Sequence, residues 1–157
     1  MKRTIIMSIA VCLLAACGGK KNNQNPEEMN TLTNKEKAVA LLKAIETGDT
    51  VAIGYVNAEN YKQHNLGVED GLDGFGRALA AMAEQGIKME YFTIHKILGC
   101  GNFVLAVSEG AFAGKPTSYY DLFRVENGKI AEHWDVMETI APESDWKHQN
   151  GKYNFPK

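Results

Sequence analysis

The sequence predicts an α+β domain in which three N-terminal helices pack against one curved antiparallel sheet. Two observations carry this prediction. Residues 35–85 contain three stretches that favour helices, two of them with apolar residues three and four positions apart. Residues 88–140 then contain four stretches rich in β-branched and aromatic residues, separated by short turns. Helices followed by a run of strands are typical of the α+β class.

The first helix is predicted over residues 35–47. It follows Asn34, a potential N-cap, and stops at Gly48. A short second helix is expected over residues 50–56, where apolar side chains follow a potential N-cap at Asp49 or Thr50. The apolar residues of the first helix lie on one face and are Ala38, Leu41, Leu42 and Ile45.

A short strand and a third helix complete the first half of the domain. Tyr61 and Gln63 alternate with their neighbours, which predicts a strand over residues 60–64. The third helix is predicted over residues 72–85, with Gly86 as the residue that ends it. Two glycines weaken its first turn, since glycine costs about 1 kcal/mol relative to alanine inside a helix. We expect another part of the chain to pack closely there.

Four strands follow, predicted over residues 88–98, 103–113, 116–126 and 129–140. Connections this short cannot cross over to form parallel pairs, so the strands form an antiparallel meander. Asn127-Gly128 joins the last two, and this pair supplies the two positive-φ residues of a type I′ hairpin turn.

The register of the last hairpin decides which polar side chains share a face. If both strands are regular, Asp121 lies opposite Trp134. His133 and Asp135 then point to the other face. A single β-bulge would reverse this assignment at the far end of the hairpin, because side chains alternate in direction along a strand. We therefore keep Asp121, His133, Trp134 and Asp135 together as one polar group. The sequence leaves open which of them share a pocket.

A curved sheet that wraps around its helices closes only partly. The space between the helices and the concave face becomes a cone-shaped cavity. Mostly apolar cavities with a few converging polar groups are the usual sites for small molecules. We therefore expect a pocket for a small, largely apolar molecule.

Residues 1–16 have the organisation of an export signal: a basic start, an apolar run too short to span a membrane, and small residues at the end. Leu14-Ala15-Ala16-Cys17 resembles the lipobox of bacterial lipoproteins, in which the peptide is removed before a cysteine that carries the lipid anchor. An ordinary signal peptide cut nearby is the alternative. Gly18 behind the cysteine favours the outer membrane, with the domain facing the periplasm.

Residues 17–34 have the low hydrophobicity of a flexible tether, and residues 35–157 are the size of a single domain. Removing Lys2 and Arg3 with the signal leaves 15 basic residues against 19 acidic ones, a net charge near −4. A chain without a basic patch is not expected to bind nucleic acid. Cys100 has no partner for a disulfide and is expected to be buried.

Three segments of this domain resemble the SnoaL-like branch of the nuclear transport factor two-like superfamily. They are Tyr61-Lys62-Gln63-His64-Asn65, the hairpin from Asp121 to Asp135, and the closing Asn150-Gly151-Lys152-Tyr153-Asn154-Phe155. The resemblance covers residues 35–155 and implies a cone-shaped fold. It leaves the function open, because this fold hosts isomerases, cyclases, dehydratases, epoxide hydrolases and binding proteins.

The resemblance also implies that a histidine on the first strand and aspartates on the last strands line the cavity. These are His64, Asp121 and Asp135, as catalytic candidates. We also expect four neighbouring residues to contact a ligand, namely Tyr61, Tyr119, His133 and Trp134. Relatives use a pocket aspartate as general acid and base, without a cofactor, next to a substrate carbonyl. A carboxylate in an apolar cavity suits this role because desolvation raises its pKa towards neutrality.

Plainer roles are open for the same residues. Asp121 could form a structural ion pair with Arg124 or Lys129, Asp135 could be solvated on the outer face, and Trp134 could fill the core. The spacing of histidines and carboxylates matches no metal motif, so no metal is expected. The alternatives to an isomerase, cyclase or lyase are a non-catalytic carrier or sensor of a small hydrophobic molecule and a dimeric interaction module.

Overall fold

The computed structural model describes residues 32–156. The predicted signal peptide, Cys17 and most of the tether lie outside the described residues. Within residues 32–156, no helix is long and apolar enough to cross a membrane. The described elements are α2 (Asn34–Thr47), η1 (Val51–Tyr55), β1 (Lys62–Gln63), α3 (Gly71–Glu84), β2 (Met89–Cys100), β3 (Phe103–Phe112), β4 (Lys115–Glu126), β5 (Lys129–Thr139) and η2 (Glu143–Asp145).

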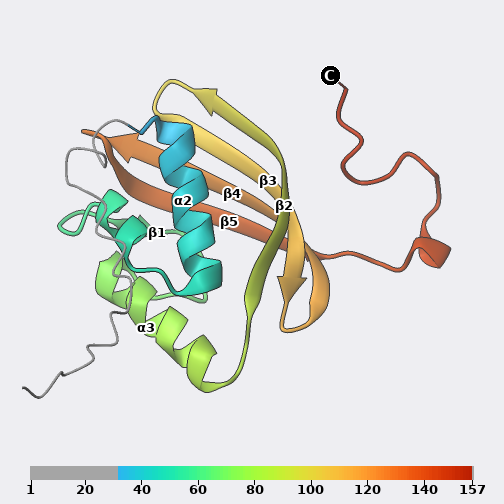
Figure 1. The fold of residues 1–157 in the computed structure, drawn as a ribbon, viewed down its shortest axis with the longest axis horizontal. Coiled ribbons are helices and arrows are strands. Elements are labelled where there is room, and N and C mark those ends of the chain that lie inside the picture. Colours follow the sequence, from blue (N-terminus) through green and yellow to red (C-terminus); the bar gives the residue numbers. More distant parts are fainter. Residues whose placement is uncertain (1–31, 157) are drawn as a thin grey trace, which may run out of the picture.

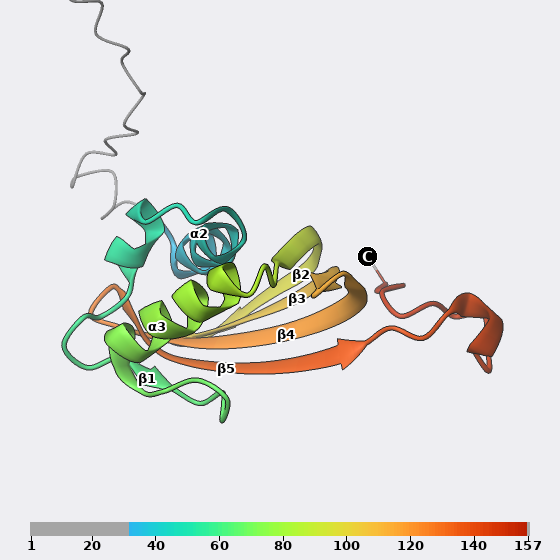
Figure 2. The ribbon, with the colours of Figure 1, turned by 90° about the horizontal axis from the view of Figure 1, so that it is seen from below.

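The strands form one curved sheet in the order β1-β5-β4-β3-β2, with α2 and α3 on the same side of it (Figures 1 and 2). The four long strands make the predicted antiparallel meander, and β1 adds a short parallel pair at the edge of β5. The predicted α+β class is confirmed. The predicted second helix is a short 3₁₀ helix, so two α-helices rather than three pack on the sheet.

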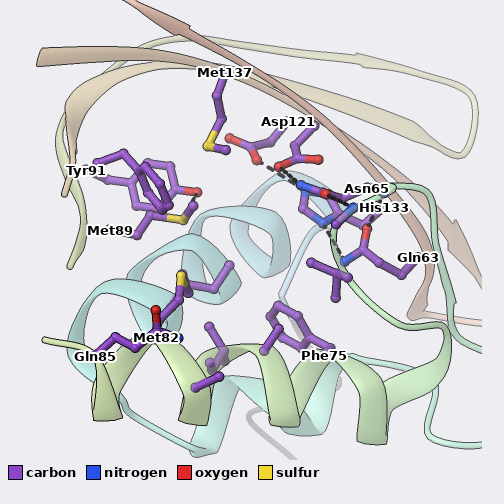
Figure 3. A pocket seen from close by; sticks show the side chains of 18 residues that line it. Gln63, Asn65, Phe75, Met82, Gln85, Met89, Tyr91, Asp121, His133 and Met137 are labelled. Carbon is purple, nitrogen blue, oxygen red and sulfur yellow. Dashed lines mark hydrogen bonds and ion pairs between the residues drawn. The ribbon is translucent and has the colours of Figure 1, made fainter. Parts of the chain in front are cut away.

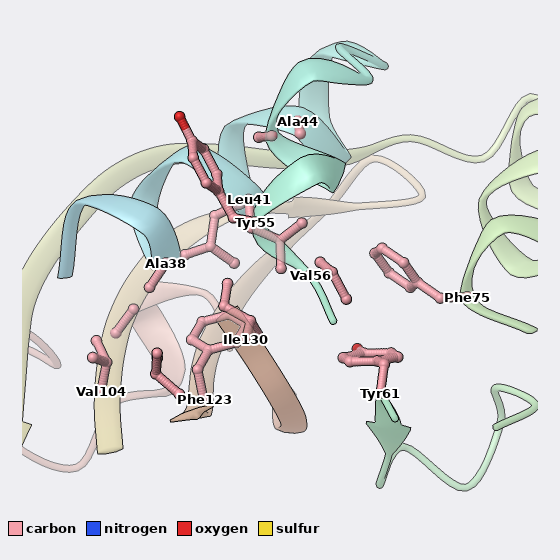
Figure 4. Close-up of a cluster of buried hydrophobic side chains, with 14 of the residues drawn as sticks. Ala38, Leu41, Ala44, Tyr55, Val56, Tyr61, Phe75, Val104, Phe123 and Ile130 are labelled. Carbon is pink, nitrogen blue, oxygen red and sulfur yellow. The ribbon is translucent and has the colours of Figure 1, made fainter. Parts of the chain in front are cut away.

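The helix α2 supplies the centre of the core. Its N-cap is Thr33 rather than Asn34, because the Thr33 hydroxyl accepts from the Glu36 backbone N–H while the Glu36 carboxylate accepts from the Thr33 N–H. Leu41 and Leu42 are buried beneath it. Both belong to one buried cluster with residues of the hairpin, and Figure 4 shows Leu41 on the side of α2 that faces Phe123 and Ile130.

The helix α3 is packed differently, because only Gly74 and Phe75 of its residues are buried. A Cβ added at Gly74 would collide with the Glu69 carbonyl. The close packing that we expected at the start of this helix is therefore present, and it explains why residue 74 is a glycine. A Cβ added at Gly76 would meet nothing within 4 Å, so the same explanation is wrong there.

These two glycines give a matched pair of stability predictions. Replacing Gly76 by alanine is expected to raise the free energy of unfolding by about 1 kcal/mol, since alanine restricts the unfolded chain and favours a helix. Replacing Gly74 by alanine is expected to lower it, because the Glu69 backbone would have to move. Urea denaturation of both variants measures the difference. Equal effects of the same sign would contradict the packing described for Gly74.

The last hairpin contains the β-bulge that sequence analysis left open. Val125 pairs with Ile130, but Arg124 pairs with Glu132, so Ala131 is an extra residue in β5. The register predicted for two regular strands is therefore wrong beyond this point. Asn127 and Gly128 have φ of 51° and 74°, as the predicted type I′ turn requires.

Cys100 is the last residue of β2 and is free, as predicted, but exposed. The expectation that it is buried is wrong, because β2 extends beyond its predicted end and carries the thiol to the tip of a hairpin.

Candidate active site in the cone

A cavity of about 370 Å³ lies between α3 and the concave face of the sheet (Figure 3). One end is polar and is built by Gln63, Asn65, Asp121, His133 and Asp135. The rest is mostly apolar and includes Phe75, Leu79, Met82, Met89, Tyr91 and Met137. Such a cavity matches the small-molecule pocket that the fold predicts.

The bulge at Ala131 creates the polar end. Beyond it, Asp121 pairs directly with Asp135, and Phe123 pairs with His133. Directly paired residues of neighbouring strands point to the same side of a sheet. Asp121, His133 and Asp135 therefore all reach the cavity, which a regular hairpin would have prevented.

Asp121 and His133 form a buried pair. The His133 Nε2 lies 3.1 Å from the Asp121 Oδ1, and the two side chains are 7% and 2% exposed. Burial raises the pKa of the Asp121 carboxyl above its ordinary value. The hydrogen bond and charge of His133 oppose this rise, and the negative charge of Asp135 adds to it. The alternative role for Asp121, an ion pair with Arg124 or Lys129, is not observed, because Asp121 pairs with His133.

Each of the two aspartates has one carboxylate oxygen that is held and one that is free. Asn65 donates from its Nδ2 to the Asp135 Oδ2 at 2.7 Å. The Asp121 Oδ2 and the Asp135 Oδ1 are buried and have no hydrogen-bond partner among the described residues. A buried polar atom without a partner costs free energy, so both oxygens are suited to a ligand or a transferred proton.

The short strand β1 supplies the remaining polar groups. It runs parallel to β5 with Gln63 beside His133. Gln63 and Asn65 therefore point into the cavity, and the Gln63 Nε2 lies 3.5 Å from the His133 Nδ1. The Gln63 Oε1 also accepts from the Asn65 backbone N–H at 3.1 Å. These bonds connect the edge strand to both the histidine and Asp135.

His64 and Trp134 do not line the cavity, so the prediction that they reach a ligand there is wrong. Both point to the outer face of the sheet, where their rings stack at 4.2 Å. The His64 Nε2 pairs with the Glu132 carboxylate at 2.9 Å, and Arg124 binds the same carboxylate. His64 points outward because side chains alternate in direction along β1 and the residues that follow it. Its neighbours Gln63 and Asn65 are the ones that point into the cavity.

Tyr61 and Tyr119 are also placed behind the cavity wall rather than on it. Tyr61 is buried, packs beside Phe75 and accepts a hydrogen bond from the Gln63 amide. Tyr119 is buried with its ring 4.7 Å from that of Tyr91, the tyrosine that lines the cavity. Their predicted contact with a ligand is therefore wrong.

Three residues that line the cavity were not predicted from the sequence as site residues: Gln63, Asn65 and Tyr91. A signal for the first two was present, because they alternate with His64 on a short strand and must point away from it. No local signal separates Tyr91 from the other aromatic residues of the strands.

The polar end brings together two carboxylates, an imidazole and two side-chain amides. Within residues 32–156, no group of three histidine, cysteine, aspartate or glutamate side chains is arranged to hold a metal ion. Two carboxylates and an imidazole in an apolar cavity can take, hold and return a proton. Burial raises the pKa of the Tyr91 hydroxyl well above its usual value, so this group stays neutral and can only donate or accept hydrogen bonds.

Solved structures with this fold come from several bacteria. A protein of unknown function from Burkholderia xenovorans, described as NTF-2 like, is 21% identical with a TM-score of 0.55, over 80% of this chain and 98% of that one. IdmH, a candidate polyketide cyclase from Streptomyces antibioticus, is 17% identical with a TM-score of 0.51, over 68% and 93%. AclR, a candidate hydroxylase from Streptomyces galilaeus, is 15% identical with a TM-score of 0.51, over 68% and 79%.

At these identities the similarity shows the fold and not the reaction. A search of curated proteins finds no match to this chain. The family model described as a SnoaL-like domain matches residues 38–133, which include most of α2, all of β1 and α3, and the hairpin as far as His133. The chain belongs to the SnoaL-like domain family, and its fold is NTF2-like.

Proposed function

We propose that this protein catalyses cofactor-free proton transfer on a small, largely apolar carbonyl compound, as an isomerase, cyclase or aldol-type enzyme. One observation carries the proposal: the Asp121–His133 pair lies beside Asp135 at the polar end of an otherwise apolar cavity. The candidate polyketide cyclase of the same fold agrees with this class of reaction.

In this mechanism the free Oδ2 of Asp121 takes the proton from the carbon next to the carbonyl. The electrons of the broken C–H bond move into the carbonyl and form an enolate. His133 holds the other oxygen of Asp121 and fixes the direction of the free one. Asp121 then returns the proton at another carbon; in the aldol case the enolate carbon attacks a second carbonyl of the same molecule, and Asp121 gives the proton to the alkoxide that forms. The raised pKa of Asp121 suits it to both halves of this cycle.

A second candidate, binding without catalysis, is favoured by the packing of α3. Leu79 and Met82 of this helix face the cavity instead of a packed core, and both are only partly buried. An apolar molecule in the cavity would cover them and complete the core on that side. A carrier or sensor needs only this step.

One assay separates the two candidates. The full chain is incubated in deuterated buffer with a panel of small two-ring ketones, and the exchange of protons next to the carbonyl is followed by NMR. Catalysis predicts exchange faster than in buffer alone, and loss of this acceleration in Asp121→Asn. Ketones that bind, as judged by protein-detected shifts, but exchange at the buffer rate would overturn the catalytic proposal and leave the carrier.

We also propose that the protein is exported and anchored in the cell envelope through a lipid on Cys17, with the domain facing the periplasm. The support is the signal-like segment and the Leu14-Ala15-Ala16-Cys17 motif. Metabolic labelling with a radioactive fatty acid tests this proposal. Wild-type protein should incorporate the label and Cys17→Ser should not; unlabelled wild type would overturn the anchor.

A further inference from the structure

The charged side chains that line the cavity are acidic. None of the described residues that line it is a lysine or an arginine, whereas two are aspartates. A carboxylate or phosphate placed at the polar end would face Asp121 and Asp135 without a fixed cation to compensate it. Burying an uncompensated anion is costly, and like charges add to that cost. The cavity therefore discriminates against anionic molecules.

The polar end also has a shortage of hydrogen-bond donors. The Asn65 amide and the His133 imidazole each serve one aspartate oxygen, at 2.7 and 3.1 Å. The second oxygens, the Asp121 Oδ2 and the Asp135 Oδ1, have no donor from the described residues. Asp121 is 1% exposed, so bulk water does not readily supply one. A ligand that brings a donor to this end would satisfy an acceptor that is otherwise unpaired.

We infer that the ligand of this cavity is an uncharged apolar molecule that carries a hydroxyl group, and that this hydroxyl donates to the free Oδ1 of Asp135, beside the base Asp121. The inference rests on the proposed function, because it takes the same cavity as the site and names its substrate class. A hydroxyl near the reacting carbonyl would orient that carbonyl beside the base.

A hydroxyl fits this end better than a protonated amine does. His133 already presents its ring to Asp121, so an ammonium group bound there would lie next to a second proton-bearing nitrogen. An ammonium ion would also pair with the carboxylates and lower their pKa, which would make them weaker bases for the proposed proton transfer. The apolar remainder of the cavity offers it no further partner beyond neutral side chains.

Four ligands with the same body test the inference on the wild-type full chain. They are naphthalenes that carry a hydroxymethyl, a methoxymethyl, an aminomethyl or a carboxylate group, and their affinities are measured by calorimetry at neutral pH. The hydroxymethyl compound should bind at least tenfold more tightly than the methoxymethyl compound, which has no donor. The carboxylate should bind at least a hundredfold more weakly than the hydroxymethyl compound. Equal affinity of the alcohol and the ether, or tightest binding of the amine or the carboxylate, would overturn the inference.

Two variants test whether Asp135 causes the preference for the alcohol and the exclusion of the carboxylate. Asp135→Asn is expected to reduce the preference for the alcohol over the ether and to weaken the exclusion of the carboxylate. Glu132→Gln, on the outer face of the same strand, is the matched control and should change neither. A preference that survives in Asp135→Asn places the hydroxyl elsewhere and overturns the inference.

The binding series tests the ligand class and the exchange assay tests the reaction, so each hypothesis can be rejected without the other. Selective binding of the alcohol without catalysed exchange would leave the ligand class standing and remove the proposed reaction. Catalysed exchange without the predicted ranking would leave the reaction standing and remove the ligand class.

Discussion

Replacing Asp121 by asparagine is expected to abolish proton transfer and, at the same time, to make the folded protein more stable at neutral pH. Loss of a general base costs about a hundredfold to ten-thousandfold in rate. The stability effect has the opposite sign because Asp121 is buried and its ionised form is desolvated. Asparagine keeps the size of the side chain and an oxygen that can accept from His133, but it carries no charge to bury. We expect a gain of about 1 to 3 kcal/mol in the free energy of unfolding at pH 8.

The pH dependence distinguishes this role from a structural one. The pKa of Asp121 in the folded protein is raised above the ordinary value of 3.8, so the folded state binds more protons than the unfolded state between the two pKa values. The contribution of Asp121 to stability is therefore complete below the unfolded pKa and is lost as pH rises through the folded pKa. The advantage of Asp121→Asn should be absent near pH 4 and grow towards pH 8.

Urea denaturation of wild type and variant at several pH values measures this difference. Glu132→Gln is a control of opposite sign. The hydrogen bond from His64 lowers the pKa of Glu132, so its contribution is present at neutral pH and is lost as pH falls through the folded pKa. A loss of stability in Asp121→Asn that is equally large at pH 8 and pH 4 would make Asp121 a structural partner of His133 instead of a base.

Elements with strong local signals could be predicted from the sequence. The apolar spacing around Leu41 and Leu42 gave α2, and Asn127-Gly128 gave the turn of the hairpin, because both depend on neighbouring residues only. The predicted N-cap differs by one residue, since the capping box needs Glu36 as well as Thr33 and both must be recognised together.

The site depended on one residue that local signals do not fix. Ala131 is bulged, and this single extra residue turns His133 and Asp135 towards Asp121. The sequence holds a weak trace of it, because Ile130 and Ala131 are adjacent and both buried, which a regular two-sided strand does not allow. That trace becomes visible only when burial is known. His64 shows the same limit, since its direction follows from the parallel pairing of β1 with β5, a contact nearly seventy residues apart in the chain.

Replacing Phe123 by alanine is expected to cause the largest loss of stability of the changes considered. Phe123 is fully buried, and its ring stacks on the His133 imidazole at 4.6 Å and 9°. Removing a buried phenylalanine ring costs about 3 to 5 kcal/mol through lost burial and the remaining cavity. This is a large part of the stability of a domain of this size. Urea denaturation at neutral pH measures the loss.

Phe123→Leu separates the two contributions of this ring. Leucine restores most of the apolar volume, so the loss of stability should fall to roughly 1 to 2 kcal/mol. It offers no flat face to His133, so the imidazole should lose its fixed orientation beside Asp121, and catalysed exchange should fall about tenfold or more. Leu42→Ala is the matched control, because Leu42 is equally buried in the same core but lies on α2, away from the polar end. It should lose stability without a change in the exchange rate of the folded fraction. Wild-type exchange in Phe123→Leu would mean that His133 is held by Asp121 and Gln63 alone and that Phe123 serves only the core.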